Sequence, residues 1–331
     1  MPAGRAFVAS SIEELIGNTP VIRINRLTAA DDAELFVKLE AYNPSGSVKD
    51  RAARNMIAEA ERRGDLQPGH TIIEVTSGNT GIGLAMNAAV KGYRSILIMP
   101  DSMSRERISL LKAYGAEVIL FPADEGVEGG VRIANELKEK IPNSYIPNQF
   151  ENIANPGIHR TTTAIEIWEQ MEGELDAFVA TAGTGGTITG TGEKLKELLP
   201  GVQVYAVESK NSPVLFSGGE PGPHKIPGTS PGFVPPILNQ GVIDEVLQID
   251  DEAAWQTARD LAQLEGILAG PSSGAAVWAG IQVARRLGAG KRVLCIAPDT
   301  GERYLSLGLF DDPEERKLEE LDRAAAPAES L

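Results

Sequence analysis

Lys49 is the residue of this chain whose type and position are best suited to covalent chemistry. It lies in the first turn of a predicted helix, Val48–Arg63, which ends at Gly64 as a C′ glycine. The positive end of a helix dipole and partial burial both lower the pKa of an amine. A neutral lysine amine is the nucleophile that forms a Schiff base with a carbonyl compound. Alone, Lys49 is weak evidence, and its neighbours Asp50 and Arg51 are expected to be solvated or structural charges.

The segment Gly183-Thr184-Gly185-Gly186-Thr187 has the composition of a phosphate-binding loop. It follows a predicted apolar strand, Ala177–Thr181, and opens a predicted helix, Thr187–Leu199. Free backbone N–H groups and the positive helix end form an anion site there, and glycines let the backbone approach a phosphate closely. One short motif is weak evidence, so a glycine-rich tight turn is the alternative.

Two nucleotide-binding interpretations of this loop fit less well. Glu208, at the end of the next predicted strand, stands where a ribose-binding acid would, but Ile188 occupies the third glycine position of G-x-G-x-x-G. A Walker loop would need Gly-Lys-Ser/Thr at its end, and the chain does not have that sequence here. A nicotinamide-linked oxidoreductase stays open as a rival, although it leaves Lys49 without a role.

A second polar loop, Thr76-Ser77-Gly78-Asn79-Thr80-Gly81, joins a predicted strand to a predicted helix. Ligands of open α/β sheets bind at this edge, and the donors of the loop suit a carboxylate at a helix N-terminus. A capped helix start, with Ser77 or Asn79 as the N-cap, explains one polar residue rather than four. Lys49 and the two loops together indicate a lysine-bound pyridoxal phosphate that acts on an amino acid.

The remaining polar candidates carry less weight. Ser272 opens a further predicted helix and by itself is a helix cap, a role that Ser273 fills equally well. The three histidines, His70, His159 and His224, show neither metal-ligand spacing nor a Ser/His/Asp set. We therefore expect no metal site and treat these histidines as structural.

Short apolar runs alternate with longer helical patterns along the chain. The predicted strands are Leu35–Leu39, Thr71–Val75, Ser95–Met99, Glu117–Phe121, Ala177–Thr181, Gln203–Val207, Val246–Ile249 and Arg292–Ala297. The predicted helices are Val48–Arg63, Thr80–Lys91, Ser104–Tyr114, Gly126–Lys140, Ile158–Met171, Thr187–Leu199, Asp251–Glu265 and Ser273–Leu287. Near-continuously apolar strands between helices are typical of buried parallel sheets. We therefore predict an α/β protein of two lobes, each a mainly parallel twisted sheet flanked by helices.

Glycine-rich strand-to-helix turns, one in each half, suggest where the lobes divide. Residues 1–152 are predicted to form an N-terminal lobe, 153–312 a C-terminal lobe and 313–331 a tail. The part before about residue 40 is expected to pack on the other lobe. The proline- and glycine-rich stretch Pro213–Pro236 is predicted to be a long ordered loop, because strands continue after it. The acidic, then alanine-rich segment Asp312–Leu331 is predicted to be a frayed helix or tail.

Composition restricts the class of protein. The chain has 331 residues and a net charge of −15, which argues against nucleic acid and against anionic membranes as partners. The one cysteine, Cys295, lies in a predicted buried strand, so we expect a structural thiol and a reducing compartment. No secretory signal is visible in Met1–Ser10, and no apolar run is long enough to span a bilayer. A cytoplasmic protein is expected.

The chain resembles the cysteine synthase family, also called O-acetylserine sulfhydrylase, among the β-family or fold-type II pyridoxal-phosphate enzymes. The resemblance runs from Ile16 to Ser306, nearly the whole chain. Its motifs fall in the order of the family: Asn-Pro-x-x-Ser-Val-Lys-Asp-Arg, Thr-Ser-Gly-Asn-Thr-Gly, Gln-Phe, Gly-Thr-Gly-Gly-Thr, Gly-Pro-His-Lys-Ile and Ser-Ser-Gly-Ala. It implies a fold similar to the tryptophan synthase β subunit.

The resemblance also implies roles for individual residues. Lys49 is the implied Schiff-base lysine and the base that later removes Cα–H. The implied cofactor contacts are Asn79 at the ring hydroxyl, Gly183, Thr184, Gly185, Gly186 and Thr187 at the phosphate, and Ser272 at the pyridine nitrogen. The implied site for the substrate carboxylate comprises Thr76, Ser77, Thr80 and Gln149. A neutral serine makes the ring a weaker electron sink than an aspartate would, which suits β-elimination.

The implied reaction is a β-replacement that makes L-cysteine from O-acetyl-L-serine and sulfide through an aminoacrylate. The resemblance further implies a homodimer, closure of the smaller lobe over the substrate, and possible binding of the C-terminal tail of serine acetyltransferase. Relatives with the same core use O-phosphoserine or serine, or accept homocysteine, thiosulfate or hydroxyurea-like nucleophiles, and a catalytically inactive paralogue is a further rival. The loop Gly228–Phe233 departs from the family pattern Gly-Ile-Gly-Ala-Gly-Phe, and its polar Ser230 suggests, as a minority hypothesis, a nucleophile other than sulfide.

Overall fold

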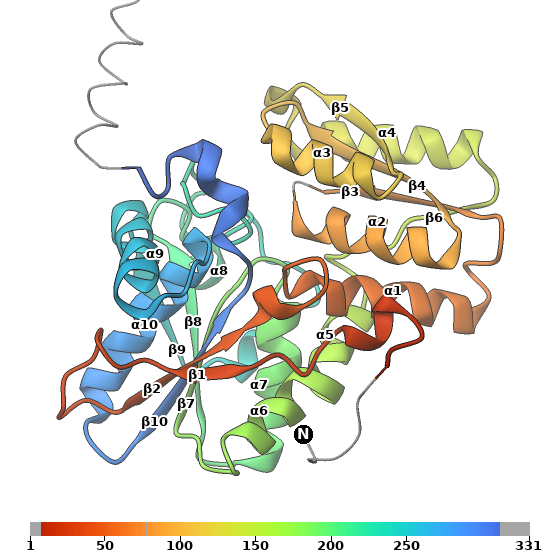
Figure 1. Cartoon of the computed structure of the whole chain (residues 1–331). Helices are drawn as coiled ribbons and strands as arrows, with labels where there is room; N and C mark the ends of the chain where they lie inside the picture. The colour runs from red at the N-terminus through yellow and green to blue at the C-terminus, as the bar shows by residue number, and fades with distance from the viewer. Residues whose placement is uncertain (1–7, 77, 312–331) are drawn as a thin grey trace, which may run out of the picture.

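The computed structural model describes residues 8–76 and 78–311 and contains two separate β-sheets. The larger sheet has the order β1-β2-β10-β7-β8-β9, with β1 (Val21–Arg23), β2 (Glu34–Leu39), β10 (Arg292–Ala297), β7 (Ala177–Thr181), β8 (Gln203–Ser209) and β9 (Glu245–Ile249). The smaller has the order β5-β4-β3-β6, with β5 (Glu117–Phe121), β4 (Arg94–Pro100), β3 (Thr71–Val75) and β6 (Ser144–Tyr145). Every pair is parallel except β1 with β2. The predicted α/β class is confirmed (Figure 1).

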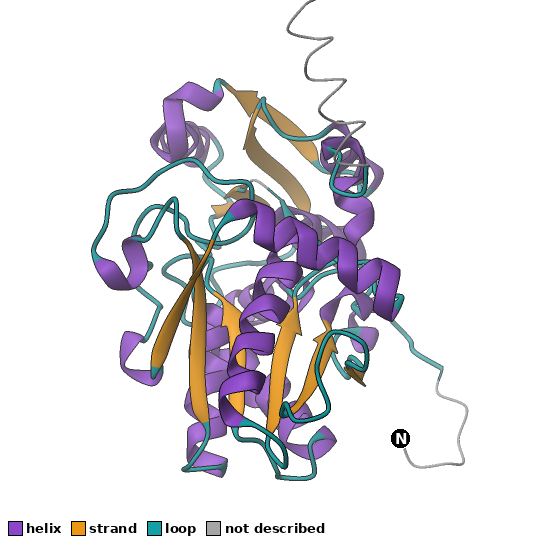
Figure 2. Ribbon diagram, turned by 90° about the vertical axis from the view of Figure 1, so that its left-hand side faces the viewer, coloured by secondary structure: helices purple, strands orange, loops and turns teal. Residues whose placement is uncertain are grey.

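Helices cover both faces of each sheet, which is why the strands are apolar on both sides. On the larger sheet, α9 (Asp251–Glu265) and α10 (Pro271–Leu287) pack on one face, and α6 (Ala164–Gln170) and α7 (Gly186–Leu198) on the other. Figure 2 shows these strands side by side with helices in front of and behind them. On the smaller sheet, α2 (Asn79–Lys91) and α3 (Arg105–Ala113) cover one face and α4 (Gly126–Lys140) the other.

The helix that begins at Lys49 lies where the two sheets meet. Helix α1 (Lys49–Arg63) packs against α2 and against α5 (Ala154–Ile158), which follows the last strand of the smaller sheet. The N-terminal strands β1 and β2 belong to the larger sheet, because Glu34–Leu39 pairs with Arg292–Ala297 in register. The lobe boundaries at 152 and 312 remain predictions.

The eight strands and seven of the eight helices expected from the sequence are present within one or two residues of the expected ends. The helix expected at Ile158–Met171 is instead α5, a π-helical turn at His159–Thr163 and α6. The Thr162 hydroxyl donates to the carbonyl of Ile158 at 2.7 Å within this widened turn. The stretch Pro213–Pro236 is not wholly loop, because it contains the short helix α8 (Val214–Ser217). The prediction for Asp312–Leu331 lies outside the described residues.

None of the helices in the described part of the chain is long and apolar enough to cross a membrane. None of the His, Cys, Asp and Glu residues in that part cluster as metal ligands do. Cys295 is fully buried in β10 as a free thiol, and burial raises the pKa of that thiol. The structural interpretation of Cys295 agrees with this position.

Candidate active site

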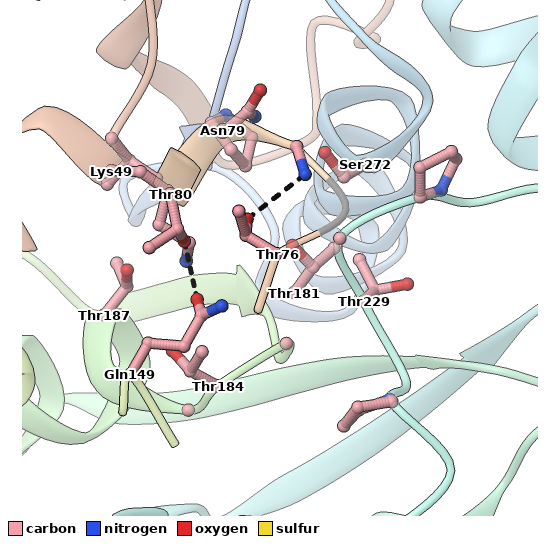
Figure 3. A pocket seen from close by; sticks show the side chains of 18 of the residues that line it. Lys49, Thr76, Asn79, Thr80, Gln149, Thr181, Thr184, Thr187, Thr229 and Ser272 are labelled. Carbon is pink, nitrogen blue, oxygen red and sulfur yellow. Dashed lines mark hydrogen bonds between the residues drawn. The ribbon is translucent and has the colours of Figure 1, made fainter. Parts of the chain in front are cut away.

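A cavity of about 290 Å³ opens between the two sheets, at the carboxyl ends of β3 and β7. Its volume is close to the lower end of the range of small-molecule sites, roughly 300–1,000 Å³. The sequence-predicted residues that line it are Lys49, Thr76, Asn79, Thr80, Gln149, Gly183, Thr184, Gly185, Thr187 and Ser272 (Figure 3). Gly186 does not line the cavity but is the first residue of α7, between Gly185 and Thr187. Ser77, also predicted, lies outside the described residues.

Backbone hydrogen bonds of Val48 and of Lys49 itself hold Lys49 at the cavity. The N–H of Val48 donates to the carbonyl of Pro298 at 2.8 Å, and the N–H of Lys49 donates to the Ser47 hydroxyl at 3.3 Å. Burial lowers the pKa of the Lys49 amine to about 8, and the carboxylate of Asp299 opposes that shift. A substantial fraction of this amine is therefore neutral near physiological pH, which is the form that attacks a carbonyl carbon.

The loop at the start of α7 leaves no room for side chains at its glycines. A Cβ at Gly183 would overlap the carbonyl oxygen of Gly228, and one at Gly186 would overlap the side-chain oxygen of Asn155. Gly185 has φ +83°, and its Cβ would lie 2.8 Å from Cβ of Leu238. Only glycines fit between these neighbours, so the backbone of the loop is bare, and it lies next to the first N–H groups of a helix of 13 residues. This arrangement fits a phosphate group.

His159 supports the same loop, a contact that the sequence does not reveal. Its Nε2 lies 3.3 Å from the hydroxyl of Thr187, and its Nδ1 lies 2.9 Å from the hydroxyl of Thr163. Burial lowers the pKa of His159 to about 3, with the charge of Arg51 acting in the same direction. The ring is therefore neutral at physiological pH and positions Thr187 without carrying charge.

The loop before α2 and the segment that follows β6 meet across the cavity. The hydroxyl of Thr80 donates to Oε1 of Gln149 at 2.5 Å (Figure 3). The hydroxyl of Thr76 accepts the N–H groups of Gly78 at 3.3 Å and Gly81 at 3.1 Å, which closes the loop on itself. These donors lie at the N-terminus of α2, where a carboxylate is favoured.

Glu74 holds the segment that carries Gln149. Its buried carboxylate accepts the N–H of Asn148 at 2.8 Å and that of Gln149 at 3.5 Å. Asn148 has φ +52°, a left-handed backbone that this anchor stabilises. Burial raises the pKa of Glu74 to about 7, against the two backbone hydrogen bonds.

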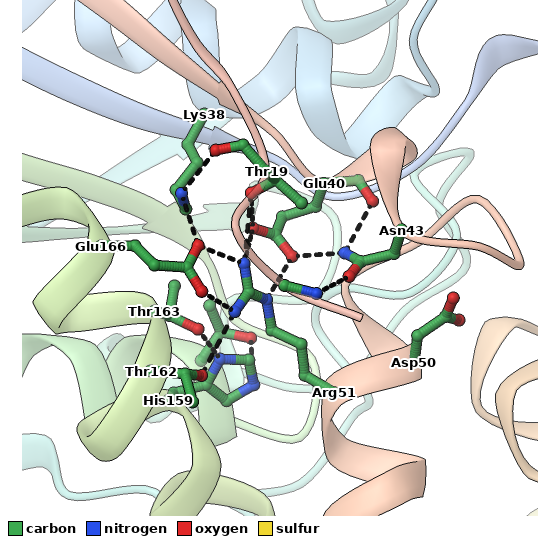
Figure 4. A network of polar contacts seen from close by, with 12 residues as sticks. Thr19, Lys38, Glu40, Asn43, Asp50, Arg51, His159, Thr162, Thr163 and Glu166 are labelled. Carbon is green, nitrogen blue, oxygen red and sulfur yellow. Dashed lines mark hydrogen bonds and ion pairs between the residues drawn. The ribbon is translucent and has the colours of Figure 1, made fainter. Parts of the chain in front are cut away.

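A network of buried charges fixes the start of α1 to the rest of the molecule (Figure 4). The Arg51 guanidinium binds Glu40 at 2.8 Å and Glu166 at 2.6 Å, and Glu166 also binds Lys38 at 2.8 Å. All four side chains are buried or nearly so, and they come from β2, the segment after β2, α1 and α6. Of the two expectations for Arg51, the structural one is correct. Because Arg51 is two residues from Lys49, the network also positions that lysine.

Sequence reasoning missed several residues around the cavity. Asn79 donates from Nδ2 to Asp299 at 2.8 Å and accepts a hydrogen bond from Arg303. Tyr304 also lines the cavity, with the guanidinium of Arg107 lying 5.3 Å from its ring centroid. The residues Gly301-Glu302-Arg303-Tyr304, at the end of the segment that resembles the cysteine synthase family, could have pointed to Arg303 and Tyr304 as site residues. Asp299 is 220 residues from Asn79, so no local pattern could connect them.

Ser230 does not face the cavity. Its hydroxyl accepts the N–H of Ser209 at 2.8 Å, and its own N–H donates to Ala182 at 2.9 Å. The neighbours Thr229, Pro231 and Phe233 do line the cavity, where Phe233 packs on Phe150 at a centroid distance of 5.1 Å. The geometry therefore does not support the hypothesis that the polar Ser230 selects a nucleophile other than sulfide.

Comparison with known proteins agrees with this geometry. A family model described as pyridoxal-phosphate dependent enzyme matches residues 12–299. The probable cysteine synthase of Bacillus subtilis (strain 168) is 60% identical over 306 residues, which cover 92% of this chain and 98% of that protein. The crystal structure of O-ureido-L-serine synthase is similar with a TM-score of 0.89 and 44% identity, over 94% of this chain and 99% of that one.

A third similar protein is the cysteine synthase of Entamoeba histolytica. Its crystal structure matches with a TM-score of 0.89 and 40% identity, over 94% of each chain. The family model covers most of the chain, and the match to the Bacillus protein is close over nearly its whole length. This chain therefore belongs to the pyridoxal-phosphate dependent enzymes and, among them, to the cysteine synthase family.

Proposed function

We propose that this protein is a cysteine synthase, which forms L-cysteine from O-acetyl-L-serine and sulfide. The observation that carries the proposal is the convergence of three features on one cavity. These are the Lys49 amine with its lowered pKa, the bare glycine loop at the start of α7, and the Thr80–Gln149 pair. The similarity to proteins named cysteine synthase supports the same reaction.

The residues of the cavity fit pyridoxal phosphate. Lys49 would bind its aldehyde carbon, the backbone of Gly183–Thr187 its phosphate, Asn79 its ring hydroxyl and Ser272 its pyridine nitrogen. When bound, this cofactor withdraws electrons from the α-carbon of the amino acid and so makes the Cα–H acidic. Ser272 is buried in the first turn of α10 and its hydroxyl carries no charge, so it does not hold the pyridine nitrogen protonated.

The other side chains bind and orient the amino acid. Thr76, Thr80 and Gln149 surround the N-terminus of α2, where the Thr76 hydroxyl, the Gln149 amide and the backbone N–H of Thr80 would hold the α-carboxylate of the substrate. Since Thr80 donates to Oε1 of Gln149, the amide nitrogen of Gln149 is turned away from that contact and stays available as a donor. Fixing the carboxylate at one end directs the β-carbon, with its acetate leaving group, into the cavity.

Lys49 then moves the proton. Once the amino group of the substrate has replaced it on the aldehyde carbon, the Lys49 amine, with a pKa of about 8, is free to take the proton from the α-carbon. It would hold that proton at Nζ while acetate leaves from the β-carbon. The aromatic pair Phe150 and Phe233 forms an apolar wall of the cavity, which disfavours water as a competing nucleophile. Sulfide then adds to the β-carbon, and the proton returns to the α-carbon from Lys49.

The direct test is product formation with the purified protein loaded with pyridoxal phosphate. O-Acetylserine and sulfide should give L-cysteine, and the K49A variant should give none above background. Parallel reactions replace O-acetylserine with O-phosphoserine or L-serine, and sulfide with thiosulfate, homocysteine or hydroxyurea. Hydroxyurea belongs in the set because one similar structure is an O-ureido-L-serine synthase. A rate with another pair that exceeds the rate with O-acetylserine and sulfide would overturn the proposal.

We also infer a cytoplasmic homodimer that binds the C-terminal tail of serine acetyltransferase. The family resemblance supports the dimer and the partner, and the single buried free thiol fits a reducing compartment. Light scattering of the purified protein tests the dimer, and a monomer at micromolar concentration would contradict it. Titration with the terminal decapeptide of a serine acetyltransferase tests the partner, with competition by O-acetylserine expected.

A further inference from the structure

We propose that Asp299 is a positioning residue of the active site, which orients the amide of Asn79 toward the cofactor ring. Asp299 follows β10 and is 1% exposed. Its Oδ2 accepts a hydrogen bond from Nδ2 of Asn79 at 2.8 Å and another from the hydroxyl of Tyr304 at 2.6 Å. The inference rests on the proposed contact between Asn79 and the cofactor.

Hydrogen bonds to both the oxygen and the nitrogen of the Asn79 side-chain amide determine its orientation. Its oxygen accepts from Nη1 of Arg303, and its nitrogen donates to the carboxylate of Asp299. Turning the amide over would place its oxygen against a carboxylate and its nitrogen against a guanidinium. Arg303 is itself fixed, because its other terminal nitrogen donates to the carbonyl of Ser45. Asp299 and Arg303 therefore select one of the two amide orientations.

This selection leaves one donor for a ligand. A side-chain amide has two N–H groups, and Asp299 accepts one of them. Asn79 lines the cavity, so the second N–H is the group available to an acceptor bound there, such as a ring hydroxyl or phenolate oxygen. Without Asp299, the amide would be free to turn and present its oxygen instead.

A purely structural role explains Asp299 less well. Its second oxygen, Oδ1, is buried and has no hydrogen-bond partner among the described residues. The site around it is tight, because a Cβ at Gly270 would overlap this oxygen. Burying a carboxylate with one unpartnered oxygen costs stability, so the carboxylate is better explained by what it does at Asn79.

Asp299 also brings a negative charge to the lysine. Its carboxylate opposes the lowering of the Lys49 pKa that burial causes. Two cations lie one contact away from Asp299: Arg303, on the 3-10 helix Gly301–Leu307, bonds Asn79, and Arg107, on α3, lies over the ring of Tyr304. Removing the Asp299 charge should therefore make Lys49 lose its proton at lower pH, while the hydrogen bond to Asn79 is a separate effect.

The experiment measures the dissociation constant of pyridoxal phosphate and the pH midpoint of the rate at which apoprotein captures it, which reports the protonation of the free Lys49 amine. D299A removes both acceptor and charge, and D299N keeps an acceptor and removes the charge. We expect D299A to raise the dissociation constant about tenfold and D299N to raise it less. Both should move the pH midpoint downward. E208Q is the matched control, because Glu208 is an equally buried carboxylate that lies in β8, two strands away from β10, and does not line the cavity. It should change neither quantity.

A double-mutant cycle distinguishes a role of Asp299 in orienting Asn79 from a general contribution of Asp299 to the stability of the fold. If Asp299 acts through Asn79, the effect of D299A on cofactor affinity should largely disappear in the N79A background. An unchanged effect in that background would overturn the proposal, as would D299A and D299N proteins that only melt earlier. If D299A does not fold, the same cycle with D299N and N79A decides, because D299N still changes the acceptor that faces the Asn79 amide. Neither measurement uses O-acetylserine or sulfide, so this test remains valid even if the protein does not make cysteine.

Discussion

The hydroxyl of Thr80 and the side-chain oxygen of Gln149, both buried, are joined by a hydrogen bond of 2.5 Å in the wall of the active-site cavity. Thr80 lies in the first turn of α2, and Gln149 lies in the segment between β6 and α5. The contact joins two parts of the chain separated by 69 residues. It orients the Gln149 amide so that its nitrogen can donate to a bound carboxylate.

Replacing Gln149 by alanine should therefore weaken the binding of the amino acid without releasing the cofactor. We expect KM for O-acetylserine to rise about 10- to 100-fold, because a hydrogen bond to a charged group contributes about 1.5–3 kcal/mol. T80V should act in the same direction. Q67A removes an exposed glutamine far from the cavity and is the control. Loss of the visible cofactor band in Q149A would contradict the role given to this residue.

The reactivity of Lys49 should depend on pH with a midpoint near 8. Burial lowers the pKa of its amine to about 8, so the protonated fraction falls as the pH rises through that value. Only the neutral amine attacks an aldehyde. The rate at which apoprotein captures pyridoxal phosphate should thus increase from pH 6 to pH 9 and then level off. A midpoint near the ordinary lysine value of 10.5 would show that Lys49 is not the buried amine described here.

Breaking the buried charge network at Arg51 should cost far more stability than breaking an exposed pair. R51M leaves the fully buried carboxylate of Glu40 without its cation, for which we expect a loss of about 3–5 kcal/mol in the free energy of unfolding. The control is R94A, whose pair with Glu117 is about half exposed and should contribute less than about 1 kcal/mol. Urea unfolding of the two apoproteins measures both. Similar losses for the two variants would contradict the importance of burial.

A methyl group at Gly183 should abolish tight cofactor binding. The Cβ of G183A would overlap the carbonyl oxygen of Gly228, so one of the two backbone segments must move away from the phosphate site. We expect the dissociation constant of pyridoxal phosphate to rise at least about tenfold. The control is G201A, where nothing lies within 4 Å of the added carbon. Equal affinities for G183A and G201A would rule out this loop as the phosphate cradle.

Local patterns in the sequence were enough to predict the sheets and the position of Lys49. Parallel strands buried on both faces are apolar runs, and the glycine loops stand at their carboxyl ends, so both signals lie within a few residues. The strands β1 and β6 were missed because they have three and two residues, too few for a pattern. The π-helical turn at His159–Thr163 interrupts an otherwise helical pattern through backbone geometry that side-chain periodicity does not encode.

Contacts between distant segments could not be predicted in the same way. The partners of Asn79 and Arg51 are set by how the sheets pack, and Asp299 lies 220 residues from Asn79. Ser230 illustrates a different limit, because the sequence gives the hydroxyl but not its direction. A left-handed backbone with φ +45° turns that hydroxyl toward the N–H of Ser209 and away from the cavity.

The most direct test of the account is the visible absorption spectrum of the purified protein, recorded before and after O-acetylserine and then after sulfide. The account predicts a yellow protein whose band depends on Lys49, changes with O-acetylserine and returns when sulfide is added. A band that O-acetylserine leaves unchanged would contradict the proposed first substrate. A colourless protein that pyridoxal phosphate cannot reconstitute would contradict the central role of Lys49.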